Sequence, residues 1–296
     1  MHAEGWPVPI AQYLDVELGA PLAIERLGGK SAAAVYRVQG GRGAAIVKAR
    51  ANPREVRFYE RVAPVLSAVG IATPRLELAA RERGAQWLIL EEIPTALPRE
   101  RWTADPDVLA TLGRLHASPR PAPRDLPDRF RPAWTETMNA AALAGFAPEV
   151  AARLAPVLEA LRRESQRLFR PRCWIAGDPN PTNWGLRADG RVVLFDWERF
   201  GRGTPALDLA ITVPGLGTAD QFRLFADRYV ALVSTDVPRS WSSGDLARDL
   251  ALAKAWSLVE FLCGAAGARS ERQRAAARTV AAQIPAWLGA IAAAPR

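Results

Sequence analysis

Three oxygen-bearing side chains lie close together in the second half of the sequence. Asp178 and Asn183 are separated by four residues within the segment 177–183, which is rich in glycine, proline and asparagine. Asp196 follows Asn183 by 13 residues and comes directly after the apolar run 192–195. Together these residues offer a carboxylate base and two oxygen ligands for one hard cation. Mg²⁺ prefers a few protein oxygens beside phosphate oxygens, and an amide and a carboxylate satisfy that preference.

Each of these residues also has a simple structural explanation. Asp196 could cap the turn after a buried strand, and the segment 177–183 could be a tight connection that excludes helix and strand. Taken singly, these explanations are the stronger ones. The three residues in combination, at these spacings, favour a site for chemistry.

Lysine is rare in this chain, which makes each lysine informative. It occurs only at Lys30, Lys48 and Lys254 among 39 basic residues. Lys48 directly follows the strand-like run 44–47, in a chain that otherwise uses arginine for its positive charge. A lysine ammonium is a compact point charge that suits a phosphate group, so Lys48 is a candidate phosphate ligand.

Glu55 allows two interpretations. With Asn52 as N-cap and Pro53 at the first helical position, Glu55 stands at the third position, where glutamate commonly completes a capping arrangement. The helical spacing also places Glu55 on a buried stripe. The other members of this stripe are Tyr59, Val62, Leu66 and Val69. A carboxylate on a buried face needs a cation, so an ion pair with Lys48 is favoured over capping alone, and one glutamate could do both.

In this order and at these spacings, the residues resemble the aminoglycoside phosphotransferase family, the small-molecule branch of the protein-kinase-like fold, whose relatives include choline, homoserine and fructosamine kinases. The set comprises Lys48, Glu55, Asp178, Asn183 and Asp196, and the resemblance covers about residues 24–210. It implies that Lys48 holds the α- and β-phosphates of ATP (or GTP) and pairs with Glu55. It also implies that Asp178 accepts or orients the acceptor hydroxyl, and that Asn183 and Asp196 hold Mg²⁺.

The resemblance extends to the nucleotide and to supporting residues. The turn 27–31, which contains Ser31, would cover the phosphates, although it lacks a full G-x-G-x-x-G and could be an ordinary hairpin. The run 88–93 would be the strand and hinge that hold adenine through backbone groups of Glu91 and Ile93. His116 is given a structural role.

Two departures from the family pattern matter. The family usually has histidine two residues before the catalytic aspartate, where this chain has Ala176, which puts the loop geometry in question more than the chemistry. Only 12 positions separate Asp196 from Asp208, which leaves no room for a long activation loop. Protein substrates are therefore not expected. Asp208 would brace the backbone of the catalytic loop.

The elements that must position these residues change character near Pro94. Before it, β-like runs separated by glycine turns predict a small antiparallel sheet interrupted by one helix from Pro53 to about Val69. The predicted strands are 22–27, 33–38, 44–49, 76–80 and 87–93. After it, helical spacing predicts a mainly helical lobe with one β-like island at 173–176 and 190–197. The predicted helices are 105–118, 133–145, 148–169, 219–233, 245–264 and 271–293, with a surface loop at 119–132.

We therefore predict an α+β, bilobal protein-kinase-like fold. A nucleotide-binding lobe would span residues 1–94, and a helical lobe with the catalytic loop and acceptor site would span residues 95–296. The length of 296 residues is suited to two such lobes.

Composition excludes several other classes of protein. With 49% hydrophobic and 24% charged residues, the chain is neither disordered nor collagen-like. Cys173 and Cys263 support neither a disulfide framework nor a zinc spacing, and two histidines exclude a His-rich metal site. The net charge of +8 would suit an anionic partner, but it is spread out, and nucleic-acid binding ranks last.

We expect no membrane association. The first six residues lack the apolar core of a signal peptide, and the late apolar stretch 281–295 is too short to span a bilayer. A cytoplasmic protein, monomeric or homodimeric, is the resulting expectation.

The acceptor stays open at this level. An aminoglycoside-like acceptor is favoured on the frequency of that activity in the family, and a neutral or zwitterionic alcohol, such as choline, homoserine or a sugar, is the alternative. A polycation would need carboxylates from the late helices, for which Asp220, Asp227, Asp245, Asp249 and Glu260 are candidates. A nucleotide-binding pseudokinase is the third possibility, suggested by Ala176 and by the incomplete glycine loop.

Overall fold

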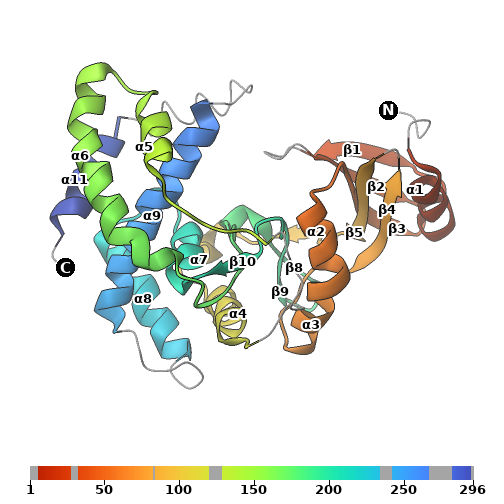
Figure 1. The fold of residues 1–296 in the computed structure, drawn as a ribbon. Helices are drawn as coiled ribbons and strands as arrows, with labels where there is room; N and C mark the ends of the chain where they lie inside the picture. Colours follow the sequence, from red (N-terminus) through yellow and green to blue (C-terminus); the bar gives the residue numbers. More distant parts are fainter. Residues whose placement is uncertain are drawn as a thin grey trace. The chain divides into compact units, whose positions relative to one another are not determined.

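A computed structural model describes residues 6–27, 33–82, 84–119, 129–233, 242–266 and 282–294 of the chain (Figure 1). The chain divides into two compact units. The first comprises Met1–Leu97, Ser118–Phe130 and Thr182–Phe200, and the second comprises Pro98–Ala117, Arg131–Pro181 and Gly201–Arg296. This division is not contiguous along the chain, unlike the boundary at residues 94 and 95 proposed from the sequence.

The first unit contains a five-stranded antiparallel sheet, as predicted. Its strands are β1 (Ala23–Leu27), β2 (Ala34–Gly40), β3 (Gly43–Ala49), β4 (Leu76–Glu82) and β5 (Ala85–Glu91), in the spatial order β1-β2-β3-β5-β4. Gly40 permits a close approach at the β2–β3 turn, since a Cβ there would lie 2.2 Å from the carbonyl oxygen of Leu18. The order places β3, which carries Lys48, in the middle of the sheet.

One long helical segment follows β3, also as predicted. It consists of α2 (Pro53–Arg57), a π-helical turn (Phe58–Val62) and α3 (Ala63–Ala68). Asn52 caps it by accepting a hydrogen bond from the backbone N–H of Arg54 at 3.0 Å. Pro64 has no N–H to donate within the helix, and the π-helical turn that precedes it accommodates this missing bond.

An N-terminal helical segment, which the sequence did not predict, completes the core of the first unit. It is formed by α1 (Val8–Tyr13) and a π-helical turn (Leu14–Leu18). Its apolar side chains Ile10, Leu14 and Leu18 pack in one cluster with residues of the sheet. The partners from the sheet are Val38, Ala45, Val47 and Ile89.

A second, three-stranded sheet in the first unit comes from distant parts of the chain. It consists of β6 (Thr95–Ala96), β8 (Trp184–Leu186) and β9 (Val192–Leu194), in the order β6-β8-β9. Arg187, just after β8, donates to the carboxylate of Glu91 at 2.9 and 2.7 Å and to the carbonyl oxygen of Thr73 at 2.9 Å. These contacts hold the segment 182–200 to the first 97 residues.

The second unit is mainly helical, as predicted. Its helices are α4 (Pro106–Ala117), α5 (Glu136–Leu143), α6 (Pro148–Ser165), α7 (Pro205–Thr212), α8 (Ala219–Val233), α9 (Ser243–Ala266) and α11 (Ile284–Ala293). Short 3₁₀ turns lie at Arg99–Arg101 and Gln166–Phe169, and a third, Pro181–Asn183, spans the boundary between the two units. The predicted α+β class is confirmed. Among the described residues, no helix combines the length and apolarity needed to cross a membrane.

Three elements of the second unit, the strands β7 (Cys173–Ile175) and β10 (Gly201–Gly203) and helix α7, position the loop that contains Asp178. The strand β7 pairs antiparallel with β10. Helix α7, which was not predicted, follows β10 directly and is buried at all eight positions. The predicted helix 271–293 is described only from residue 282 onward, and most of the predicted loop 119–132 lies outside the described residues.

Candidate active site

Lys48 and Glu55 form the ion pair that the sequence predicts. The Nζ atom of Lys48 lies 2.5 Å from Oε1 of Glu55 and 3.3 Å from Oδ1 of Asp196. The side chain of Glu55 is only 2% exposed and that of Lys48 13%, whereas Asp196 is 35% exposed. Asn52 caps the helix with its own side chain, and the carboxylate of Glu55 binds Lys48. Lys48 on the middle strand thus contacts one carboxylate from the start of α2 and one from just after β9.

Negative charge exceeds positive charge at this point of the first unit. Burial opposes the charge of the Lys48 ammonium, but Glu55 and Asp196 outweigh it and raise the pKa of Lys48. Burial raises the pKa of Glu55, and the attraction of Lys48 offsets this only in part, since Asp196 adds repulsion. An additional cation would relieve this excess of carboxylates.

The backbone at Asp196 adopts a left-handed conformation. Its φ angle is +66°, a value that residues other than glycine seldom adopt. Aspartate and asparagine tolerate it best among these residues. The turn is anchored by the next residue, Trp197, whose ring stacks on Phe58 with centroids 4.4 Å apart and planes at 10°. Its indole N–H donates to the carbonyl oxygen of Leu194 at 2.8 Å. Packing of Trp197 against the helix therefore anchors the backbone turn that carries Asp196.

The carboxylates of Glu55, Asp196 and Glu198 form a group that could hold a metal ion. One oxygen from each lies within 4.8 Å of the others. Such a set of hard oxygen donors fits Mg²⁺. The sequence analysis did not assign Glu198 to the site, although the pattern Asp196-Trp197-Glu198 places a second carboxylate two residues after the first.

Asn183, the second metal ligand predicted from the sequence, belongs to the same unit. Its carbonyl oxygen accepts a hydrogen bond from the N–H of Phe195 at 3.0 Å. Its backbone is therefore adjacent to the residue that precedes Asp196. The structure brings together Lys48, Glu55 and Asp196, with Asn183 beside them along the paired strands.

Asp178 belongs to the second unit, and its position is described within that unit. The residue before it, Gly177, has a φ angle of +86°, which turns the chain sharply after β7. The N–H groups of Ala176 and Gly177 donate to the carboxylate of Asp208, at 2.7 and 2.8 Å. The predicted brace by Asp208 is confirmed, and it acts on the two residues directly before Asp178.

His116 has a structural position, as predicted. Its Nε2 lies 3.1 Å from Asp208 Oδ2, and its Nδ1 lies 2.7 Å from the hydroxyl of Tyr229. Because the Asp208 carboxylate only accepts hydrogen bonds, we assign the proton to Nε2, so that Nδ1 accepts from Tyr229. Asp208 is thus held from α4 and binds the loop through backbone groups. The bonds from the loop to Asp208 use backbone N–H groups, so they form with alanine at position 176 as they would with histidine.

The proposed hinge for adenine is fixed by side chains from elsewhere in the first unit. The N–H of Glu91 donates to the carbonyl oxygen of Arg75 at 2.9 Å, and its carboxylate binds Arg187. Of the backbone groups of Glu91, the N–H is thus engaged within the protein, and the roles of Glu91 and Ile93 toward adenine stay predictions. A Cβ at Gly185 would lie 2.5 Å from Cγ2 of Ile93, so glycine is needed for this packing. Ser31 and its turn lie outside the described residues.

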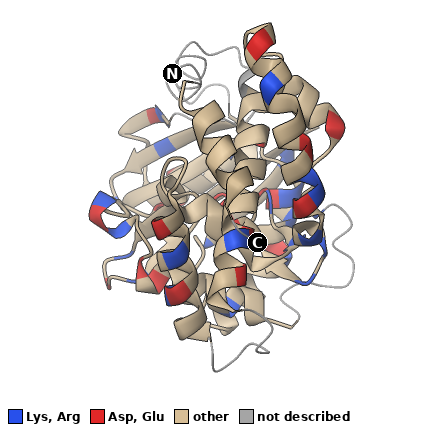
Figure 2. Cartoon of the chain, turned by 90° about the vertical axis from the view of Figure 1, so that its left-hand side faces the viewer, with Lys and Arg blue, Asp and Glu red and all other residues tan. Residues whose placement is uncertain are grey.

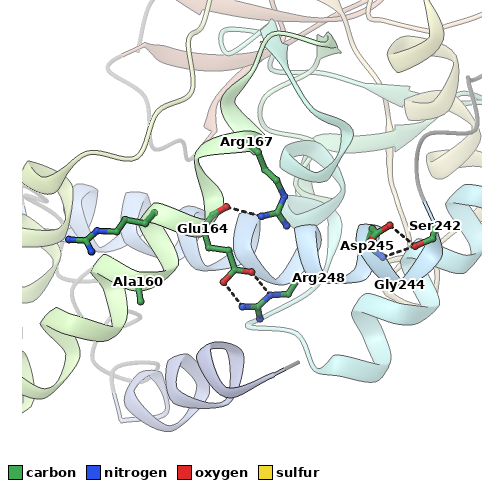
Figure 3. Close-up of a pocket in the computed structure, with 8 residues that line it drawn as sticks. Ala160, Glu164, Arg167, Ser242, Gly244, Asp245 and Arg248 are labelled. Atoms are coloured by element: carbon green, nitrogen blue, oxygen red, sulfur yellow. Dashed lines mark hydrogen bonds and ion pairs between the residues drawn. The ribbon is translucent and has the colours of Figure 1, made fainter. Parts of the chain in front are cut away.

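A cavity of about 990 Å³ lies in the second unit, between the end of α6 and the start of α9 (Figure 3). Each of the three arginines that line it is already paired with a carboxylate. The pairs are Arg163–Glu159 at 2.7 Å, Arg167–Asp249 at 2.5 Å and Arg248–Glu164 at 2.8 Å. Ser242 and Asp245 bond to each other at the start of α9. Every arginine in the described lining is therefore already bound to a carboxylate, and the cavity is poorly suited to bind an anion.

The family of the chain follows from comparison with family models. The model described as the phosphotransferase enzyme family matches residues 23–245, about three quarters of the chain. The protein belongs to this family, and the resemblance to aminoglycoside phosphotransferases inferred from the sequence is confirmed. It is a small-molecule kinase by class. Among curated proteins, no match is found.

Solved structures of similar fold include kinases of several small molecules. A choline kinase from Streptococcus pneumoniae has a TM-score of 0.61 and 15% identity, covering 95% of this chain and 98% of that one. A thermostable mutant of an aminoglycoside phosphotransferase was solved in complex with ADP and hygromycin B. It has a TM-score of 0.60 and 16% identity, and the match covers 98% of this chain and 100% of that one. A microcompartment-associated aminopropanol kinase has a TM-score of 0.62 and 13% identity, and the match covers 97% of this chain and 95% of that one. The predicted protein-kinase-like fold is confirmed.

Proposed function

We propose that this protein transfers the γ-phosphoryl group of Mg²⁺-ATP to a hydroxyl group of a small polar molecule. The observation that carries this proposal is the contact of Lys48 with Glu55 and Asp196. A lysine oriented by a buried glutamate, next to a carboxylate at a strand end, suits phosphate and a divalent cation. Two relatives of similar fold were solved with ADP or AMP, which supports a nucleotide as donor.

Each residue of the first unit has a defined task in this proposal. Lys48, oriented by Glu55, binds the oxygens of the α- and β-phosphates as a point charge. Asp196 and Asn183 would hold Mg²⁺, and Glu198 is a further candidate ligand. When bound, the ion neutralises charge on the phosphate oxygens. Backbone groups of Glu91 and Ile93 bind the base of the donor, which is ATP or GTP.

Asp178 is the proposed catalytic residue. Its carboxylate accepts or orients the proton of the acceptor hydroxyl. Phosphoryl transfer requires mainly positioning and charge stabilisation from a protein, so the placement of this carboxylate matters more than its basicity. The bonds from Ala176 and Gly177 to Asp208 supply that placement.

For the acceptor, we propose a hydroxyl compound that carries a cationic nitrogen. Choline, aminopropanol and hygromycin B, which appear with the relatives of similar fold, share this chemistry. Among the acidic residues considered from the sequence, Asp249 is paired with Arg167 and Asp245 with Ser242. These two therefore bind within the protein, and the acceptor would use other carboxylates.

The decisive experiment is ADP release with the variant Asp178→Asn. We expect kcat to fall by about a hundredfold or more, with nucleotide binding retained, because only the group acting on the hydroxyl changes. Glu149→Gln, which changes an exposed carboxylate on α6 with no proposed role in the site, is the control and should keep full activity. Normal turnover of Asp178→Asn would refute the assignment.

The acceptor class is tested with the same assay. Amino alcohols, aminoglycosides and neutral sugars are supplied in turn, each with ATP and with GTP. Turnover only with neutral sugars would contradict a cationic acceptor. Nucleotide binding without turnover on any acceptor would favour the pseudokinase alternative.

Three further expectations stay predictions from the sequence. They are a cytoplasmic location, a monomeric or homodimeric state, and no binding of nucleic acid. The last is supported by Figure 2, in which acidic and basic segments are interspersed along the ribbon.

A further inference from the structure

Lys254 is a buried cation that the proposed phosphoryl transfer does not use. It lies in the middle of α9, is 9% exposed and is one of the three lysines of the chain. Its Nζ atom donates to the carbonyl oxygens of Ala210 at 3.0 Å and of Val213 at 2.6 Å. Burying an ammonium group is costly, so a lysine at this position needs a reason.

The two carbonyl groups lie at the C-terminal end of α7. The last carbonyls of a helix have no partner within the helix and carry the negative end of its dipole. All eight residues of α7 are buried, and the helix packs against α9 (Figure 1). Bulk water therefore has little access to these carbonyls, and the ammonium of Lys254 supplies both bonds.

Helix α7 also carries the carboxylate that braces the loop. Asp208 stands two residues before Ala210 and is fully buried. It accepts the N–H groups of Ala176 and Gly177, and the next residue is Asp178. A shift of α7 along its axis would therefore move the backbone that presents Asp178.

We propose that Lys254 is a positioning residue, which fixes α7 by binding its terminal carbonyls and thereby sets the loop before Asp178 through Asp208. The inference rests on the proposed function insofar as Asp178 is the catalytic residue. The chain of contacts runs from α9 to α7 and from α7 to the loop. Lysine suits this position because its compact ammonium can bond two converging carbonyls, whereas the planar guanidinium of arginine is larger.

The test measures backbone amide hydrogen exchange in the full chain. In Lys254→Met, we expect the protection of the Ala176 and Gly177 amides to fall by about fivefold or more, relative to amides of α8. The matched control is Trp256→Phe. It removes a buried donor of the same helix, whose indole N–H bonds to the carbonyl oxygen of Ala133, a residue outside α7, at 3.0 Å. The control should leave the two loop amides unchanged relative to α8.

The outcomes separate a positioning role from general stabilisation. A loss of protection confined to the loop amides and α7, with kcat reduced and the KM for ATP unchanged, supports the proposal. Equal loss throughout the second unit, or no loss at the loop amides, overturns it. If Lys254→Met does not fold, Lys254→Arg, which keeps hydrogen-bond donors, is judged by the same comparison.

The exchange measurement does not depend on catalysis. If Asp178→Asn keeps its activity, the proposed function fails while the coupling of Lys254 to the loop can still be observed. If Asp178→Asn is inactive and the protection of the loop amides does not change in Lys254→Met, only the positioning role fails.

Discussion

At the scale of single residues, the contact between Lys48 and Glu55 combines stability with function. Glu55 has almost no access to solvent, so the loss of its cation would leave a buried carboxylate without its partner. Breaking a buried pair costs more than the intact pair contributes, because one charge stays desolvated. Variants of Lys48 therefore change both folding and activity, and the two effects must be measured separately.

We predict that Lys48→Met lowers the unfolding free energy by about 3 kcal/mol, because Glu55 loses its partner. Chemical denaturation measures this. The double variant Lys48→Met/Glu55→Gln should recover a large part of the loss, since no charge is then buried.

Lys48→Arg should keep most of the stability and lose activity by about tenfold or more, because a guanidinium does not fit the place of the ammonium. Full activity of Lys48→Arg would mean that the lysine is not specifically required.

A second prediction concerns the ligand role of Asp196. Asp196→Asn keeps a residue that tolerates the left-handed backbone and removes the negative charge. We expect the stabilisation of the protein by ADP to lose its dependence on Mg²⁺, as measured by thermal unfolding with and without the ion. Asp189→Asn, an exposed carboxylate of the same unit, is the control. An unchanged Mg²⁺ requirement in Asp196→Asn would remove Asp196 from the site.

The sequence predicts part of this site because some residue types are unusual at their positions. Lys48 stands out in an arginine-rich chain, and Glu55 lies on an otherwise apolar helical stripe. Glu198 carries no such signal, since a glutamate in a turn is commonly solvated. The positive φ of Asp196 depends on how Trp197 packs against Phe58, a contact 139 positions apart in the sequence.

At the scale of elements, β8 determines where the proposed hinge lies. Gly185 of β8 lets Ile93 approach closely, and its pairing with β6 continues this contact. Arg187 then binds the carboxylate of Glu91. Strands that are far apart in the sequence thereby hold both ends of the segment 91–96.

We predict that Gly185→Ala displaces this segment. The added methyl group would overlap Ile93, which should cost about 1–3 kcal/mol of stability. If backbone groups near Ile93 bind adenine, the KM for ATP should rise by about tenfold while kcat changes little. Steady-state kinetics measures both. Gly41→Ala is the control in the same unit, because a Cβ there meets no atom within 4 Å. An unchanged KM in a folded Gly185→Ala protein would contradict the adenine assignment.

The elements that the sequence predicts are those with periodic patterns and clear boundaries. The five strands of the first sheet alternate with glycine turns, and the helix at Pro53 has both a cap and a buried stripe. Helix α7 was missed because burial at every position removes the periodicity. Helix α1 is only six residues long, too short for its pattern to be distinguished from a loop.

At the scale of the whole molecule, the buried ammonium of Lys254 links folding to pH. Burial lowers the pKa of Lys254 from 10.5 to about 8. Between these values the unfolded chain binds a proton that the folded chain does not. The unfolding free energy contributed by this group therefore rises with pH from about 8 to about 10.5.

We predict that the pH dependence of stability differs between the wild type and Lys254→Met in this window. The wild type should gain stability relative to the variant as the pH rises. Denaturation at several pH values measures the difference, and the comparison cancels the opposing effect of Tyr13, Tyr59 and Tyr229. Burial raises the pKa of these tyrosines, so their contribution is lost at high pH. Parallel curves for the two proteins would show that Lys254 does not titrate in this range.

The two-lobed architecture could be predicted from the change of pattern near Pro94, but the composition of the units could not. Which segments pack together depends on long-range contacts, such as those of Arg187 with Glu91 and Thr73. Local sequence patterns carry no information on such pairs. The first unit consequently contains the segment 182–200, which the sequence places in the middle of the helical part.

This arrangement has a consequence for folding during synthesis on the ribosome. The first unit lacks β8, β9 and Trp197 until Phe200 has been synthesised, when about two thirds of the chain exists. Until then Phe58, which in the folded protein stacks on Trp197 and contacts Phe200, lacks both aromatic partners. The N-terminal sheet is therefore synthesised before the segments 98–117 and 131–181 of the second unit, and it cannot bury these aromatic rings against their native partners until both segments have been made.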